Sequence, residues 1–172
     1  MKEQIYVRPI STSADSALIT QYMNNSVVFY GKTDRFTANS VSCLIYMDDE
    51  PIGFLNIGDE GLSRDNILFL DILVDENHRG KGYGSKAYSN FKSRFSDDCF
   101  IIAETKESNI GANKSLEKNG INFYSYNGLN YYLMDKDRLE ELKSSPAYER
   151  LINHIHKEKM RAYQYALSIR NG

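Results

Sequence analysis

The stretch of residues 67–91 constrains the fold of this chain more than any other part of the sequence. It reads ILFLDILVDENHRGKGYGSKAYSNF. Its first eight residues are apolar except for Asp71, and such a run is typical of a strand covered on both faces. Three glycines follow within five residues, and apolar side chains then recur at helical spacing at Ala87, Tyr88, Phe91 and Phe95. The stretch therefore predicts a buried strand, a glycine-rich loop and an amphipathic helix.

The loop between this strand and this helix has the composition of an anion site. It reads Arg79-Gly80-Lys81-Gly82-Tyr83-Gly84. Glycines let the backbone approach a ligand closely, and the free N–H groups and dipole at a helix start favour a negative charge. The loop therefore predicts phosphate binding. The alternative is an ordinary connection in which the glycines serve only for turning.

The spacing of the glycines excludes two common phosphate loops. A Walker loop needs a glycine, four residues and then Gly-Lys-Ser/Thr, and this pattern is absent. In a dinucleotide fingerprint, Ser85 or Ala87 would take the place of the final glycine. The sequence Arg79-x-x-Gly82-x-Gly84 instead resembles the acetyl-CoA loop of the GCN5-related N-acetyltransferase (GNAT) family, whose pattern is Arg/Gln-x-x-Gly-x-Gly/Ala.

A second segment, residues 109–121, resembles another signature of the same family. That signature is Asn, two residues, Ala/Ser, and later Leu/Tyr-Glu-Lys-x-Gly-Phe. The residues that coincide with it are Asn109, Ala112, Leu116, Glu117, Lys118 and Gly120. The last apolar position holds Ile121 in place of phenylalanine. Two signatures in the family's order are more specific than either alone, and the resemblance covers roughly residues 3–134.

The rest of the chain predicts a mixed α/β fold. Strand patterns occupy residues 5–10, 41–47, 52–57, 100–103, 123–126 and 131–134, and helical patterns occupy 12–22 and 109–119. Thr12-x-x-Asp15 predicts a capping box, and Asn127-Gly128 predicts a tight hairpin turn. The resemblance implies the acyl-CoA N-acyltransferase fold, in which helices flank a central mixed, mostly antiparallel sheet.

The family fold would end near residue 134, which leaves a C-terminal addition. Residues 137–143 and 148–170 have helical patterns, and the last helix carries more basic than acidic residues. We expect an N-acetyltransferase domain at 1–135 and a helical extension at 136–172, packed on the domain or on a partner subunit. A homodimer contact and a surface for nucleic acid or a protein partner are the alternatives.

Charge and cysteine content limit the classes of partner and the location that we expect for this protein. The net charge is −2, so no overall field recruits nucleic acid or an anionic membrane, and neither is expected as a partner. Cys43 and Cys99 are isolated, which suits a reducing, cytoplasmic location. The three histidines are too scattered to suggest a metal site, and no segment is apolar enough for a signal peptide or a membrane span.

The resemblance also implies where acetyl-CoA, the co-substrate, would bind. The cofactor would lie in a cleft where two neighbouring strands splay apart, with its pantetheine arm beside the central strand and its pyrophosphate on the glycine-rich loop. The expected cofactor-binding residues are Ile72, Leu73, Val74, Arg79, Gly80, Lys81, Gly82, Tyr83, Gly84, Ser85, Asn109 and Ala112.

Three further residues are candidates for catalysis. At pH 7 the solution is about 3.4 units below the pKa of a lysine-like amine, so deprotonating the amine to expose its lone pair costs about 4.6 kcal/mol. A carboxylate that acts as a general base assists this deprotonation. Glu104 is the first candidate, because relatives that resemble ribosomal-protein N-terminal acetyltransferases carry a glutamate there. Asp71 is the second, with a solvent-facing role as its alternative. At the position of Leu116, many relatives carry a tyrosine that protonates the departing thiolate. Tyr124 of the predicted hairpin is the candidate substitute for this acid.

The favoured function is transfer of an acetyl group from acetyl-CoA to a primary amine of a small molecule or protein, by direct attack in a ternary complex. A catalytically weak acyl-CoA-binding or interaction protein is one alternative, and an acetylating toxin acting on a translation component is another. The acceptor pocket would come from the irregular residues 24–40, read as a loop or a short helix, and from the hairpin.

Overall fold

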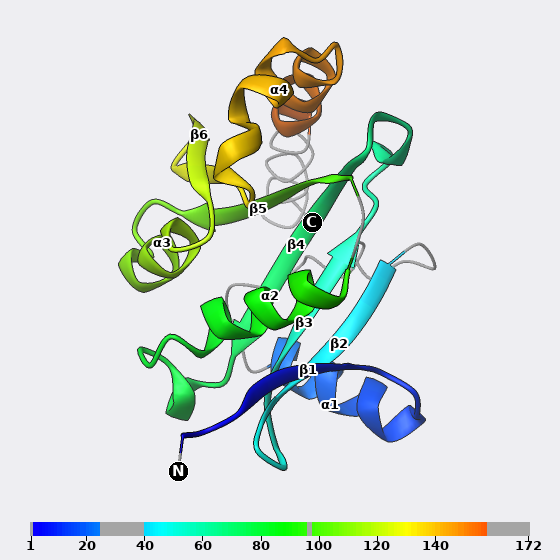
Figure 1. The fold of residues 1–172 in the computed structure, drawn as a ribbon, viewed down its shortest axis with the longest axis vertical. Helices are drawn as coiled ribbons and strands as arrows, with labels where there is room; N and C mark the ends of the chain where they lie inside the picture. The colour runs from blue at the N-terminus through cyan, green and yellow to red at the C-terminus, as the bar shows by residue number, and fades with distance from the viewer. Residues whose placement is uncertain (1, 25–39, 96–97, 158–172) are drawn as a thin grey trace, which may run out of the picture.

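The computed structural model describes residues 2–24, 40–95 and 98–157, and these form one seven-stranded sheet with the order β1-β2-β3-β4-β5-β7-β6 (Figure 1). The strands are β1 (Ile5–Pro9), β2 (Ser40–Met47), β3 (Glu50–Gly58), β4 (Ile67–Val74), β5 (Phe100–Lys106), β6 (Ile121–Tyr126) and β7 (Leu129–Leu133). Neighbouring strands are antiparallel except β4 and β5, which are parallel. The predicted mixed, mostly antiparallel sheet is confirmed.

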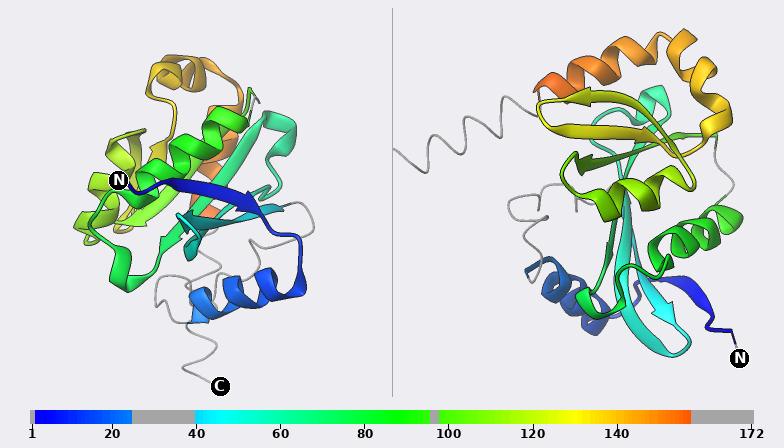
Figure 2. Two further views of the ribbon diagram at one scale, coloured as in Figure 1. Left: turned by 60° about the horizontal axis from the view of Figure 1, so that its bottom comes forward. Right: turned by 90° about the vertical axis from the view of Figure 1, so that its left-hand side faces the viewer.

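Helices cover both faces of this sheet. The α-helices are α1 (Ser13–Asn24), α2 (Tyr83–Arg94), α3 (Ile110–Glu117) and α4 (Leu139–Ser144), followed by helical residues 147–157. The 3-10 helices are η3 (Ser63–Asp65), η4 (Glu76–His78) and η5 (Lys136–Arg138). The α-helices α1 and α2 lie on opposite faces of the sheet (Figure 2).

The alternation of side chains along β4 assigns each face its own core. Leu70 points to the face of α2, where it packs with Ala87 and Phe91. Phe69 points to the opposite face, which the C-terminal helices cover, and Leu73 points to α1 on that same face. Because both faces are covered, the strand is apolar almost throughout, as its sequence predicts.

The N-terminus of α1 is fixed by the predicted capping box. The Asp15 N–H donates to Thr12 Oγ1 at 3.1 Å, and the Thr12 N–H donates to the Asp15 carboxylate at 3.3 Å. That carboxylate also accepts from the Ser11 N–H and from Arg8. The Ser11 bond is the main reason that the pKa of Asp15 is lowered. Local hydrogen bonding therefore starts this helix.

The two hairpins turn where the sequence predicts. Asn127 and Gly128 have φ values of 50° and 78°, the left-handed conformations of the tight turn that this dipeptide favours. Asp48, with φ 53°, turns β2 into β3. The turn is shorter than the gap between the predicted strands 41–47 and 52–57, because Glu50 and Pro51 already pair with Met47 and Tyr46 inside the sheet.

Several element boundaries differ from the sequence prediction, and two of them lie beside the site. β5 extends to Lys106, beyond the apolar run, because Glu104, Thr105 and Lys106 continue to pair with β7. α3 ends at Glu117, two residues before the end of the predicted helical pattern at 109–119, and Gly120 does not have a positive φ. A Cβ on Gly120 would lie 2.8 Å from the Leu133 carbonyl oxygen, so close packing against β7 requires the glycine.

The described C-terminal helices pack on the sheet. Leu142, Ala147, Leu151 and Ile155 are buried in one cluster with residues of β4, β5 and β7, on the face that lacks α2. The predicted last helix is described to residue 157. Of the predicted irregular segment 24–40, residues 25–39 lie outside the described residues. The division of the chain at residue 135 stays a prediction. No helix among residues 2–24, 40–95 and 98–157 is long and apolar enough to cross a membrane.

Candidate active site

The parallel pair β4 and β5 opens into a wedge near its middle. The strands pair from Ile67 with Phe100 as far as Leu70 with Ala103. Beyond that point β4 continues beside β3 to Val74, while β5 continues beside β7 to Lys106. No residue of β4 beyond Leu70 is aligned with a residue of β5 in this register. An extended ligand can bind there as an additional strand would.

Asp71 and Glu104 are the first residues on either side of the wedge. Strand alternation places Asp71 on the same face as Phe69, and Glu104 on the same face as Ile102. Both carboxylates therefore project from the face opposite α2. Asp71 is 7% exposed, whereas Glu104 is half-buried. The structure thus brings together the two carboxylates that sequence reasoning treated as separate candidates.

A short polar row leads across the sheet to Asp71. Asn56 of β3 is fully buried and pairs in register with Asp71 on one side and with Ser42 of β2 on the other. The Ser42 hydroxyl donates to Asn56 Oδ1 at 2.8 Å. Polar side chains inside a sheet are costly to bury, so a polar row that ends at Asp71 makes the wedge a candidate site.

The end of β4 is locked by its own turn. Asp75 caps η4: one carboxylate oxygen accepts from the His78 N–H at 3.1 Å and lies 2.6 Å from His78 Nδ1. Arg79 Nε then donates back to the Val74 carbonyl oxygen at 2.9 Å. Part of the Arg79 guanidinium therefore holds the turn in place, and its two terminal nitrogens are the part that can meet an anion.

The glycine-rich loop depends on backbone conformation at two positions. Gly80 and Gly82 have φ values of 78° and 79°, a backbone conformation that residues with a side chain rarely adopt. Gly82 is the N-cap of α2. The first-turn N–H groups of α2 precede the first intrahelical bond, from the Lys86 N–H to the Gly82 carbonyl oxygen at 3.1 Å. They are available to an anion, as the loop sequence predicts.

The α3 side of the site is held by two asparagines. Asn109 caps α3 by accepting from the Ala112 N–H at 3.1 Å. Asn113 Nδ2 donates to the carbonyl oxygens of Lys106 and Asn109 at 2.9 and 2.7 Å, and Asn113 Oδ1 accepts from the Tyr132 hydroxyl at 2.7 Å. Asn113 thereby joins the end of β5, the start of α3 and β7. Sequence reasoning missed it, because its partners are carbonyl groups that no motif reveals.

A cavity of about 490 Å³ lies among the wedge, the glycine-rich loop and α3. All the predicted site residues line it except Lys81, Ser85 and Tyr124. Those that do are Asp71, Ile72, Leu73, Val74, Arg79, Gly80, Gly82, Tyr83, Gly84, Glu104, Asn109 and Ala112. The loop signature, the second signature and the two carboxylates therefore meet in one cavity.

The three exceptions are engaged elsewhere. Tyr124 lies on β6, where its hydroxyl is 2.6 Å from His156 Nε2 of the C-terminal helix. Ser85 Oγ accepts from Asn119 Nδ2 at 2.8 Å and ties α2 to the end of α3. Lys81 Nζ lies 6.0 Å from the centroid of the Tyr83 ring. Among the described residues, Tyr83 is the only tyrosine that lines the cavity. Leu116 also lines it, at the position where many relatives carry the tyrosine that protonates the thiolate.

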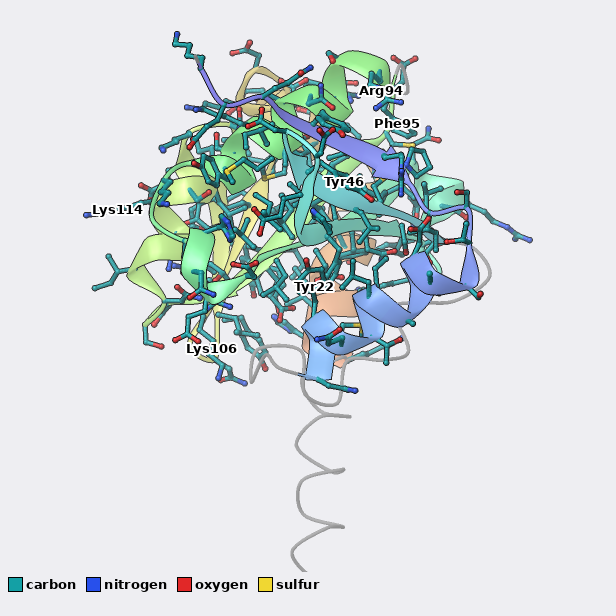
Figure 3. The ribbon with its side chains drawn as sticks, turned by 90° about the horizontal axis from the view of Figure 1, so that it is seen from below. Tyr22, Tyr46, Arg94, Phe95, Lys106 and Lys114 are labelled. Atoms are coloured by element: carbon teal, nitrogen blue, oxygen red, sulfur yellow. The ribbon has the colours of Figure 1, made fainter. Side chains whose placement is uncertain are left out.

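Three basic residues line the cavity in addition to the predicted ones. His78 lies in the turn before the loop, Lys114 lies on α3, and Lys118 is the C-cap residue of that helix. A Cβ built on Gly82 would lie 3.3 Å from Lys118 Nζ, so this lysine lies over the loop. Figure 3 shows Lys114 at the outer rim of the molecule. The four-residue spacing of the two lysines was the signal available in the sequence.

These features fit acetyl-CoA. Helix-start N–H groups and the cations Arg79, Lys114 and Lys118 suit its phosphates, and the open edge of β4 suits the amide groups of a pantetheine arm. The volume is in the range of small-molecule sites. Fold and site together define an acyl-CoA-dependent transferase of the N-acyltransferase fold.

Comparison with protein families gives the same class. The model of the Acetyltransferase (GNAT) family matches residues 13–121, which is more than half of the chain, so the chain belongs to this family. The resemblance stated from the two signatures is confirmed. Members of the family are acetyltransferases that use acetyl-CoA as co-substrate, and this chain is an acetyl-CoA-dependent N-acetyltransferase by membership. A search of curated proteins gives no match.

Solved structures share the fold at low sequence identity. RimL, a ribosomal α-N-protein acetyltransferase, is 17% identical with a TM-score of 0.56, covering 76% of this chain and 94% of RimL. The N-acetyltransferase PseH of Campylobacter jejuni, in complex with acetyl-CoA, is 15% identical with a TM-score of 0.55, covering 77% and 99%. The aminoglycoside acetyltransferase AAC(6')-Ib, in complex with CoA, is 17% identical with a TM-score of 0.61, covering 82% and 100%.

Proposed function

We propose that this protein transfers the acetyl group of acetyl-CoA directly to a primary amine of a small molecule or protein, in a ternary complex. The observation that carries the proposal is the wedge between β4 and β5. One cavity runs from the anion-binding loop along the open edge of β4 to the two carboxylates Asp71 and Glu104. Donor and acceptor would therefore meet from opposite faces of the sheet.

The proposed reaction needs one base and a good leaving group. The amine nitrogen attacks the thioester carbonyl carbon, a C–N bond forms, the C–S bond breaks, and the electron pair leaves with sulfur. The amine proton passes to the Glu104 carboxylate, directly or through water. Glu104 is favoured over Asp71 because it is half-buried and accessible, whereas Asp71 is 7% exposed. A thiolate with a pKa near 8.5 can leave without an acid, so Leu116 is compatible with turnover.

A second candidate function is acyl-CoA binding with little catalysis. The specific observation in its favour is Leu116, which lines the cavity and cannot protonate a thiolate. The two candidates differ in one measurable respect, because only the first releases CoA thiol when an amine is present.

The test is release of free thiol from acetyl-CoA in the presence of polyamines, aminoglycosides, amino acids and N-terminal peptides. We expect at least one amine class to raise thiol release well above the rate without acceptor. Acetyl-CoA binding measured by calorimetry without turnover on any amine would favour the second candidate. Failure to bind acetyl-CoA would contradict both.

A further inference from the structure

Tyr83 connects the cofactor loop to the N-terminal segment of the chain. It is the first residue of α2, its ring is 4% exposed within the core, and it lines the cavity. Its hydroxyl donates to a carboxylate oxygen of Glu3, which precedes β1 and lies outside the residues matched by the family model. This bond raises the pKa of Tyr83, so the phenol stays protonated at neutral pH and acts as the donor.

Two lysine side chains also lie near the Tyr83 ring. Lys81 Nζ lies 6.0 Å and Lys86 Nζ 5.8 Å from its centroid, within the range of cation–π attraction. The His78 ring lies 6.5 Å away. A phenol that donates to a carboxylate gains electron density on its ring, which strengthens the attraction of both lysines. Neither lysine lines the cavity, so both pack on Tyr83 beside the first turn of α2, whose N–H groups face the anion site.

The hydrogen bond to Glu3 acts at the end of α2 that the ligand uses. The helix is also tied to β1 further along, because the Val7 N–H donates to Asn90 Oδ1 at 3.0 Å and Arg94 donates to the Val7 carbonyl oxygen. Arg94 lies at the far end of the helix, beside Phe95 (Figure 3). These contacts hold the helix on the sheet, whereas Tyr83 and Glu3 fix its first turn.

We propose that Tyr83 and Glu3 form a positioning pair for acetyl-CoA, because their hydrogen bond holds the first turn of α2 in the geometry that accepts the pyrophosphate. The inference rests on the proposed acetyl-CoA site. It adds an N-terminal residue and a side-chain role to a loop whose family pattern specifies only arginine and glycines.

Two variants test the pair from its two ends. Tyr83→Phe removes the hydroxyl and keeps the ring, and Glu3→Ala removes the acceptor from an exposed position. We expect each to weaken acetyl-CoA binding, measured by calorimetry, on the order of fivefold, the net effect of one typical hydrogen bond. The KM for acetyl-CoA should rise in step, with kcat and the acceptor KM unchanged. The double variant should bind no more weakly than either single one.

Tyr88→Phe is the matched control. Tyr88 lies on the same helix and is 3% exposed, and its hydroxyl has no hydrogen-bond partner in the described part of the chain. Its loss should leave acetyl-CoA affinity unchanged. Unchanged affinity in Tyr83→Phe or Glu3→Ala, or additive losses in the double variant, would overturn the inference while the proposed function stands. A wild-type protein that does not bind acetyl-CoA would overturn both.

Discussion

Gly82 and Gly84 stand two residues apart in the same loop, yet the structure places different demands on them. Gly82 needs φ near 79°, and Lys118 lies over it. Gly84 is already within α2, and a Cβ there would make ordinary contacts of 3.6 to 3.8 Å with Ser115, Ile72 and Val74. This agrees with the family pattern, which requires glycine at the first position and accepts alanine at the second.

The first prediction separates these two glycines. Gly82→Ala should cost about 1–2 kcal/mol in backbone strain and raise the KM for acetyl-CoA at least tenfold, because the loop must shift. Gly84→Ala should be neutral or stabilising by up to about 1 kcal/mol, because alanine favours a helix. Thermal unfolding and acetyl-CoA titration measure both effects. Equal losses of affinity in the two variants would contradict the assignment of the loop.

The second prediction assigns the base. Glu104→Gln should lower kcat about 100-fold or more and abolish the rise of kcat with pH, because the amide cannot accept the amine proton. Asp71→Asn should lower kcat less. Both variants should keep the affinity for acetyl-CoA, which isolates the effect on the acceptor step.

The control for this comparison is Glu107→Gln, which removes the same charge from an exposed position just after β5. It should leave kcat within a factor of about two of wild type. A larger loss in Asp71→Asn than in Glu104→Gln would reverse the roles of the two carboxylates.

At the scale of elements, the site depends on how β5 is joined to α3. The Asn113 side chain bonds to backbone groups at the end of β5 and at the start of α3, and to the Tyr132 hydroxyl on β7. This junction sets where Asn109 and Ala112 lie relative to the wedge. A second helix end therefore faces the cavity opposite the glycine-rich loop.

The third prediction concerns this junction. Asn113→Leu should destabilise the protein by about 2 kcal/mol, because two backbone carbonyl groups lose their donor, and should raise the KM for acetyl-CoA. Asn122→Leu is the matched control, because Asn122 is exposed on β6 and makes a single long bond of 3.4 Å to Ser125. Urea unfolding and steady-state kinetics distinguish the two variants. Full stability in Asn113→Leu would show that the network is not needed.

At the scale of the whole molecule, the C-terminal helices complete the sheet face from which the two carboxylates project. Leu151 is fully buried in the cluster that contains Phe69 and Ile102. Polar contacts secure the same face, with Arg150 bound to Asp65 through two nitrogens and His154 Nε2 2.8 Å from Glu60. The described part of the extension is therefore an integral layer of the fold.

The fourth prediction follows from this packing. Leu151→Ala should cost about 3 kcal/mol and lower Tm by roughly 6–12 °C, because it leaves a cavity in a buried cluster. Asn153→Ala, on the exposed side of the same helix, should change Tm by no more than about 2 °C. Deleting residues 136–172 should make the protein aggregate. A soluble, monomeric deletion variant with the wild-type Tm would show that the extension is dispensable.

Sequence reasoning predicted the local features of this protein. The buried strand β4, the loop with its glycines, the capping box at Thr12 and the turn at Asn127 each depend on residues within one turn or one strand. The two signatures also identified the family and its donor. Such features follow from conformational preferences and spacing, which are properties of the chain itself.

Only the tertiary structure decided which residues meet. The register of β4 against β5 puts Asp71 and Glu104 on either side of one wedge, and the C-terminal helix brings His156 to the Tyr124 hydroxyl, away from the cavity. Partners separated by tens of residues come together through sheet order and packing, which no local spacing encodes. The glycine-rich loop was therefore predictable from the sequence, whereas the position of Asp71 and Glu104 across one wedge depends on the assembly of distant strands.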